Sequence, residues 1–171
     1  KLFQRLATQL EPDTLALNEA FTNEAFFQEN GLTKETALTL FIPNTYEFYW
    51  NTSASKRASK MAKEHKKFWT NERLEKAKAL NMTPAQVYTL ASIVHKETVK
   101  ADERPRVAGA YLNRINQDMP LQADPTVIYA IKEKSGDFDQ VIKRVGGSNL
   151  FVSSPYNTYI NKGLPPGPIA M

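Results

Sequence analysis

Helix-starting signals, in which a capping residue precedes a proline, occur twice in this sequence and constrain its fold more than any other feature. In Thr83-Pro84 and Asp124-Pro125, a side-chain oxygen stands just before the first helical residue, and proline occupies that residue. These signals predict helices over 83–98 and 124–131. Further helices are predicted over 13–29, over a lysine-rich segment from about 53 to 80, over 102–116 and, briefly, over 137–143.

Two segments depart from the helical pattern. Residues 37–49 are rich in aromatic and β-forming residues and are interrupted by Pro43-Asn44, which predicts a short strand and a turn. The last twenty residues contain Pro155 and the string GLPPGP and are expected to form loop or edge strand. The predicted fold is therefore α+β, mainly α-helical, with a small amount of strand.

The composition is that of an ordinary globular chain and excludes some kinds of site. Of the 171 residues, 42% are apolar and 23% are charged, enough for a substantial core. The absence of cysteine excludes disulfides and cysteine-ligated metals. The two histidines, His65 and His95, do not have the spacing of a zinc motif. Neither a metal nor another cofactor is expected.

Basic residues exceed acidic ones, giving a net charge of +4. Much of the excess lies in one run: Lys56, Arg57, Lys60, Lys63, Lys66 and Lys67. We interpret this run as a solvated helix face. Because it lacks interleaved aromatic residues and belongs to no known binding module, nucleic acid is not expected as a partner.

The ends of the chain and its hydropathy bear on where it works. No stretch of 18 apolar residues is present, so no segment is expected to span a membrane. The chain begins at Lys1 and stops at Met171 after a proline- and glycine-rich loop. Both ends are interpreted as cuts in a longer protein, and a membrane anchor is expected only upstream of Lys1.

Glu97 is the strongest candidate for catalysis. Val87, Leu90, Ala91 and Val94 recur at helical spacing and define the expected buried stripe of segment 83–98. Glu97 follows Leu90 by seven residues, almost two helical turns, and therefore extends this stripe at the helix C-terminus. Burial and the negative helix end both raise the pKa of a carboxyl group, as a general acid requires. A boundary glutamate that reaches water or pairs with a cation has the same pattern.

Other polar residues form a second set of candidates. Arg114 is expected to point inward from the helix over 102–116 and to pair with Glu103, Asp124 or Glu97. Capping of the helix alone would explain Asp124. The remaining candidates for sugar contact or support of a site are Tyr46, Asn113, Gln122, Thr126, Tyr129, Asn157 and Tyr159.

Strings from residue 41 to residue 170 resemble, in the same order, those of the endolytic murein transglycosylases, the MltG or YceG-like family. The strings are FIPNTY at 41–46, ASIVHKET at 91–98, ER at 103–104, VAG at 107–109, LNR at 112–114, MPLQADPTVIY at 119–129, YNTY at 156–159 and GLPPGPIA at 163–170. This resemblance implies a compact, lysozyme-like catalytic domain over 37–171, truncated at its C-terminus. Residues 1–36 are expected to form an adjoining subdomain or linker.

The resemblance also implies a reaction. Such enzymes cleave the β-1,4 bond between N-acetylmuramic acid and N-acetylglucosamine without water and leave 1,6-anhydro ends. One carboxylic acid serves as acid and then as base, and Glu97 matches its motif. The implied substrate is the peptidoglycan glycan strand, with cell-wall synthases as possible partners. The implied location is the periplasmic side of the inner membrane, to which the full-length protein is anchored.

One departure from the family keeps alternatives open. Many relatives have acidic residues at the positions of both His95 and Glu97, whereas here Glu97 alone is acidic. If the first position held the catalytic acid, this chain would be impaired; helical geometry favours Glu97. The alternatives are a glycoside hydrolase that uses Glu97 as acid and Asp124 as base or nucleophile, and a non-catalytic glycan-binding module.

Overall fold

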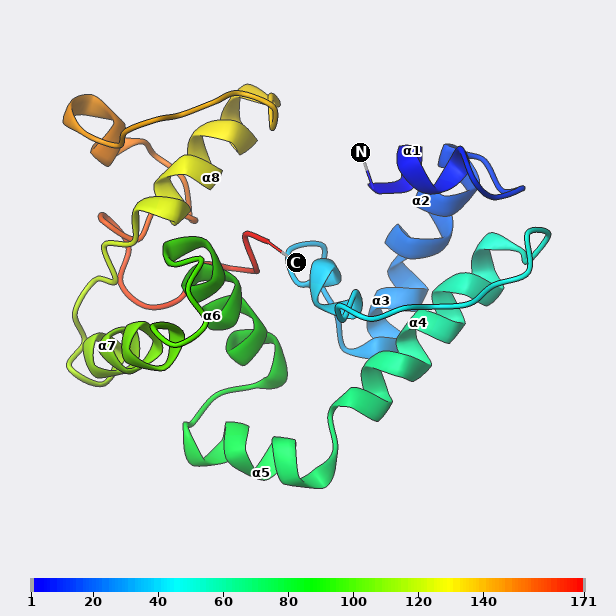
Figure 1. Cartoon of the computed structure of the whole chain (residues 1–171), viewed down its shortest axis with the longest axis horizontal. Coiled ribbons are helices and arrows are strands. Elements are labelled where there is room, and N and C mark those ends of the chain that lie inside the picture. The colour runs from blue at the N-terminus through cyan, green and yellow to red at the C-terminus, as the bar shows by residue number, and fades with distance from the viewer. Residues whose placement is uncertain (1, 171) are drawn as a thin grey trace. The chain divides into compact units, whose positions relative to one another are not determined.

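The computed structural model describes residues 2–170 and divides the chain into two compact units, residues 1–76 and 77–171 (Figure 1). Within 2–170 no residue belongs to a β-strand, so the predicted α+β fold is wrong and the described chain is all-helical. None of the described helices is long and apolar enough to cross a membrane. The expected boundary between an adjoining segment, 1–36, and a catalytic domain, 37–171, lies inside the first unit and stays a prediction.

The first unit contains four α-helices and the start of a fifth. They are α1 (Leu2–Ala7), α2 (Thr14–Thr22), α3 (Glu24–Asn30), α4 (Ala54–Phe68) and the beginning of α5 (Asn71–Ala79). Asp13 caps α2 through the Ala16 amide at 2.8 Å, as predicted. Asn23 ends α2 and caps α3, so the single helix predicted over 13–29 is two helices.

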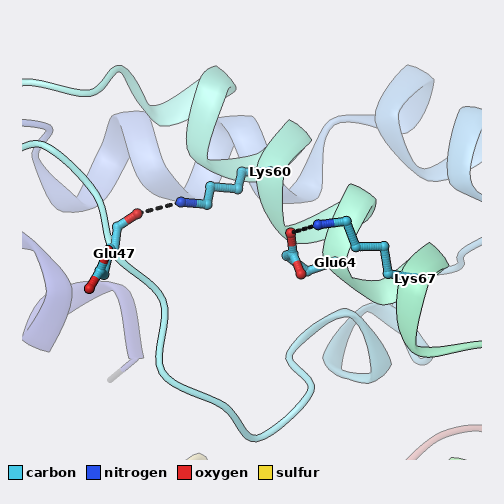
Figure 2. A network of polar contacts seen from close by, with 4 residues as sticks. All are labelled: Glu47, Lys60, Glu64 and Lys67. Carbon is cyan, nitrogen blue, oxygen red and sulfur yellow. Dashed lines mark hydrogen bonds and ion pairs between the residues drawn. The ribbon is translucent and has the colours of Figure 1, made fainter.

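The strand predicted over 37–49 is absent for a physical reason. Residues Ala37–Leu40 form a short 3-10 helix, η1, and the chain then continues without regular structure to α4. A strand requires a partner for its backbone groups, and the described chain offers none at this segment. Side chains of α4 hold part of the segment instead. Figure 2 shows Lys60 donating to the backbone carbonyl of Glu47 at 2.5 Å, one turn before the Lys67–Glu64 ion pair at 2.7 Å.

The second unit contains the helices that carry the candidate residues. It comprises the end of α5, then α6 (Pro84–Glu97), α7 (Arg104–Asn116), α8 (Asp124–Ser135) and the 3-10 helix η2 (Gly147–Phe151). Thr83 starts α6 through a capping box with Gln86. The helices predicted over 83–98 and 102–116 are confirmed, whereas the short helix predicted over 137–143 is absent.

The core of the second unit joins α6, α7 and the segment that leads into α8. Its buried members are Met82, Leu90, Ile93, Val94, Tyr111, Leu121 and Ala123. The C-terminal segment runs back past these helices (Figure 1), and the Ile169 amide donates to Ser92 Oγ on α6 at 3.0 Å. This packing brings the end of α6, the start of α8 and the C-terminal segment into one region.

Candidate active site

The end of α6 and the middle of α7 hold the first part of the site. Glu97 is the last residue of α6 and is exposed, whereas Tyr111 on α7 is only 8% exposed. The Tyr111 hydroxyl donates to Glu97 Oε2 at 3.0 Å. Because the ring of Tyr111 is fixed in the core, this bond fixes one carboxylate oxygen of Glu97.

The burial predicted for Glu97 is wrong, because Glu97 is exposed. The predicted face of the helix is nevertheless close to the one that it occupies. Glu97 follows the fully buried Ile93 by four residues and lies on the same side of α6. It is the last residue of the helix, beyond the part that its neighbours cover. Thr89 and Ser92, two polar residues of the same helix, are buried and donate their hydroxyls to helix carbonyls, which satisfies their polar groups.

Burial and the neighbouring carboxylate both act on Tyr111. Burial raises the pKa of its hydroxyl, and the negative charge of Glu97 and the bond to it raise that pKa further. Arg114, one turn further along α7, has the opposite effect. Tyr111 therefore remains a hydrogen-bond donor throughout the physiological pH range.

Arg114 forms hydrogen bonds with the loop that precedes α8. Its Nη1 donates to the Leu121 carbonyl at 2.6 Å and, at 3.5 Å, to Pro120 O and Gln122 Oε1. Among residues 2–170 no ion pair joins Arg114 to a carboxylate, so the predicted pairing with Glu103, Asp124 or Glu97 is wrong. Backbone carbonyls satisfy this cation instead.

Gln122 adopts a backbone conformation that is costly for a residue with a side chain. Its φ is 50°, in the left-handed region. The backbone amide of Gln122 donates to the Thr158 carbonyl at 2.9 Å, and its side-chain oxygen accepts from Arg114 Nη1. These hydrogen bonds offset the conformational cost. Strained, well-supported backbone of this kind is frequent at functional sites. Gln122 is exposed beside the start of α8.

Asp124 and Tyr159 form a second carboxylate–tyrosine pair. Asp124 is the exposed first residue of α8, and the Tyr159 hydroxyl donates to its Oδ1 at 2.6 Å. The predicted capping role is wrong, because Ala123 occupies the cap position. The bond to Asp124 raises the pKa of Tyr159 to about 12, with further contributions from burial and from the charges of Asp124 and Glu97.

The two pairs belong to one site. The charges of Glu97, Asp124 and Arg114 all act on both tyrosines, Tyr111 and Tyr159. Such effects decline with distance, so these groups lie near one another at the exposed edge where α6, α7 and α8 meet.

Two predicted contact residues are buried and hold the site together. Thr126 and Asn157 are completely buried. The Thr126 hydroxyl lies 2.8 Å from that of Thr158, and Thr158 Oγ1 in turn accepts the Ala123 amide at 3.1 Å. Asn157 Nδ2 donates to two carbonyls of the preceding segment, and its Oδ1 accepts the Tyr159 amide at 2.9 Å. These bonds join the segment that carries Tyr159 to the start of α8.

Three further candidates are not part of this pairing. Asn113 is exposed on α7, about 160° around the helix from Tyr111. The ring of Tyr129 packs on Tyr156 with a centroid distance of 4.6 Å, and burial raises the pKa of its hydroxyl. Tyr46 belongs to the first unit, where its hydroxyl donates to the Ile42 carbonyl at 2.5 Å.

Sequence reasoning missed the roles of two residues. Sequence analysis assigned Tyr111 no role at the site; its aromatic ring with a polar end is the signal for a buried donor. Thr158 was not singled out, and its position between Asn157 and Tyr159 is the sole signal in the sequence.

The second unit thus presents two exposed carboxylates, those of Glu97 and Asp124, each bonded to a tyrosine hydroxyl. The model of the YceG-like family matches residues 1–171. This chain therefore belongs to the YceG-like family.

Named relatives and a solved structure agree with this assignment. The chain is 40% identical over 92 residues to the endolytic murein transglycosylase of Streptococcus pneumoniae serotype 2 (strain D39 / NCTC 7466), covering 54% of this chain and 16% of the relative. It is 33% identical over 160 residues to that of Bacillus subtilis (strain 168), covering 93% and 40%. The crystal structure of a yceG-like protein from Listeria monocytogenes matches with a TM-score of 0.76 and 28% identity, covering 98% of this chain and 57% of the other. The chain thus spans less than half the length of these curated relatives.

Proposed function

We propose that this chain is the catalytic part of an endolytic peptidoglycan lytic transglycosylase with Glu97 as its single acid/base. The observation that carries the proposal is the exposed Glu97 carboxylate at the end of α6, held at one oxygen by buried Tyr111. The names of the relatives from Streptococcus pneumoniae and Bacillus subtilis support the substrate class. Partnership with cell-wall synthases, an upstream membrane anchor and work on the periplasmic side stay predictions from the resemblance.

In the first step, Glu97 acts as the acid. Protonated at Oε1, it gives its proton to the oxygen that links C1 of the muramoyl sugar to the glucosamine, and the C1–O bond breaks with its electron pair on that oxygen. Tyr111 keeps the other oxygen fixed, so the proton is presented from one direction. A glycan strand lying over the exposed carboxyl group excludes water from it.

In the second step, the same residue acts as the base. The Glu97 carboxylate takes the proton of the C6 hydroxyl of the muramoyl sugar, and O6 forms the new bond to C1. The product end is a 1,6-anhydro ring, and no water is consumed. Because the substrate supplies the nucleophile, a second catalytic carboxylate is unnecessary.

The remaining polar groups bind and position the sugar. Asp124 and Gln122 are exposed beside Tyr159 and offer acceptors and an amide donor for hydroxyl and N-acetyl groups. Thr126 and Asn157, which are buried, support this surface from below. Asn113, Tyr129 and Tyr46 remain candidates for contact with more distant sugars of the strand.

A glycoside hydrolase is the second candidate, because Asp124 is a second exposed carboxylate in the same site. In that reaction Asp124 activates water or attacks C1, and the new end is a reducing sugar rather than an anhydro sugar. The chemical nature of the product ends separates the two functions.

Mass spectrometry of purified glycan strands after incubation tests the proposal. The parent chain is compared with Glu97→Gln and with Glu75→Gln, a control that makes the same change at an exposed position of α5. We expect anhydro-muramoyl ends from the parent and from Glu75→Gln and none from Glu97→Gln, with unchanged circular dichroism. Anhydro ends from Glu97→Gln would exclude Glu97 as the catalyst. Binding of strands by the parent without any new ends would favour the non-catalytic module.

A further inference from the structure

The connection between α6 and α7, residues 98–103, directly follows Glu97 (Figure 1). Glu97 is the last residue of α6, and helix ends fray because their backbone groups have few partners within the helix. The bond from Tyr111 fixes one oxygen of the Glu97 side chain, but it does not hold the backbone of the last turn. A carboxyl group with one fixed position therefore also requires bonds at the end of α6.

Thr98, the residue after Glu97, makes such bonds. Its backbone amide donates to the Val94 carbonyl of α6 at 3.3 Å. Its hydroxyl donates to Glu103 Oε2 at 2.7 Å and accepts the Lys100 amide at 3.1 Å. Because a hydroxyl has a single proton to donate, these two bonds fix its orientation. Thr98 is thus bonded both to the helix and to the connection that follows it.

Glu103 joins this arrangement to α7. Its carbonyl accepts the Val107 amide at 3.1 Å, at the start of the helix that carries Tyr111. Its other carboxylate oxygen, Oε1, pairs with Lys100 Nζ at 3.1 Å. Within the described part of the chain its side chain makes no capping bond to α7, so both oxygens serve the connection. The Thr98 hydroxyl, followed by Lys100, lowers the pKa of Glu103, which keeps it ionised at neutral pH.

We propose that Glu103 is a positioning residue for the cleavage reaction, which holds the end of α6 through Thr98 so that the Glu97 carboxyl group keeps one position. This inference rests on the proposed function, because it concerns the same carboxyl group. Tyr111 fixes the side chain of Glu97, and Glu103 fixes the backbone that carries it. The ion pair with Lys100 is largely exposed and adds little, so the charge-assisted bond to Thr98 has the main effect.

Cleavage kinetics on purified glycan strands test this role. Glu103→Ala and Thr98→Val each remove one partner of the bond, and valine suits the extended backbone at position 98, where φ is −139° and ψ is 138°. Each variant should lower kcat at least about fivefold with little change in KM, because misplacing a catalytic group by about 1 Å can cost roughly 100-fold. A rate for Glu103→Ala within twofold of the parent would overturn the proposal.

Conservative variants separate positioning from a general loss of structure. Thr98→Ser keeps a hydroxyl donor and Glu103→Gln keeps an oxygen acceptor, so both should recover most of the rate. Failure of both to recover it would overturn the proposal. The double variant Thr98→Val/Glu103→Ala should be little slower than either single variant, because both changes remove the same bond. A loss equal to the product of the two single losses would contradict the bond.

Lys100→Gln and Glu75→Ala serve as controls, with every rate measured well below the melting temperature of the variant. Lys100→Gln removes the ion pair alone, and Glu75→Ala shortens an exposed glutamate of α5. Both should cleave at the parent rate. A loss in Lys100→Gln as large as that in Glu103→Ala would assign the effect to the ion pair and overturn the role of the Thr98 bond.

Amide hydrogen exchange tests the inference independently of cleavage. The protection factor of the amide at position 98 should fall at least about fivefold in Glu103→Ala and stay near the parent value in Glu103→Gln, because local opening exposes that amide. Equal protection in the parent and in Glu103→Ala would overturn the proposal. If the parent makes no anhydro ends, the proposed function fails, whereas the exchange result still decides whether Glu103 holds the end of α6.

Discussion

Removal of the hydrogen bond from Tyr111 to Glu97 is expected to lower the rate of cleavage. The variant Tyr111→Phe keeps the ring, which is almost completely buried, and removes only the hydroxyl that donates to Glu97 Oε2 at 3.0 Å. A hydrogen bond to a charged group contributes about 1.5–3 kcal/mol. If that energy positions the catalytic carboxyl group, its loss lowers kcat by about tenfold to about 150-fold. The rate of anhydro-end formation at saturating glycan concentration measures this effect.

Folding and substrate binding serve as controls for this prediction. The melting temperature of Tyr111→Phe should fall by only about 2–4 °C, because the loss of one hydrogen bond costs about 1 kcal/mol. KM should change less than kcat because Tyr111 does not touch the sugar in the proposed mechanism. Tyr49→Phe makes the same chemical change at a residue that is 85% exposed and should leave the rate unchanged. A rate for Tyr111→Phe within twofold of the parent, while Glu97→Gln is inactive, would refute the positioning role.

Three further predictions concern stability and are measured by urea unfolding. Tyr159→Phe should lower the free energy of unfolding by about 1 kcal/mol, and adding Asp124→Asn should lower it little further; additive losses in a double-mutant cycle would contradict the bond at 2.6 Å. The pKa of Tyr159 is raised to about 12 and that of Tyr111 is also raised, so both hydroxyls hold their protons more tightly in the folded chain. Their stabilising contribution is complete below the unfolded pKa of about 10 and is lost as pH rises through the folded pKa values. The urea midpoint should therefore fall from about pH 10 to pH 12, and it should fall less in Tyr111→Phe. An equal fall in both proteins would contradict the contribution of Tyr111. Ser92→Ala removes the acceptor of the Ile169 amide and should cost about 1 kcal/mol; an unchanged midpoint would show that the C-terminal segment is held elsewhere.

Local capping chemistry made the helix starts predictable. Thr83 and Asp13 cap the helices that the sequence assigns to them, because a cap and the amides it serves are only two or three residues apart. The same rule was off by one residue at Asp124, which is the first residue of α8; its carboxylate accepts the Tyr159 hydroxyl from a segment 35 residues away. A partner so distant in sequence is invisible to local rules.

Tertiary context decided the features that sequence reasoning misjudged. A strand was predicted over 37–49 from residue preference alone, yet no neighbouring strand is present among the described residues to pair with it. Glu97 follows the helical periodicity of its buried neighbours, but periodicity does not reveal where the covering elements end. Arg57 belongs to the basic run that was interpreted as solvated, yet it is buried and donates to backbone carbonyls within residues 49–52.

Cleavage in water enriched in oxygen-18, by the parent chain and Glu97→Gln in parallel, separates transglycosylation from hydrolysis. A transglycosylase in which the C6 hydroxyl is the nucleophile takes up no oxygen from water. We expect unlabelled anhydro-muramoyl ends from the parent and no ends from Glu97→Gln. Reducing ends that carry oxygen-18, or equal amounts of anhydro ends from both proteins, would contradict the proposed function.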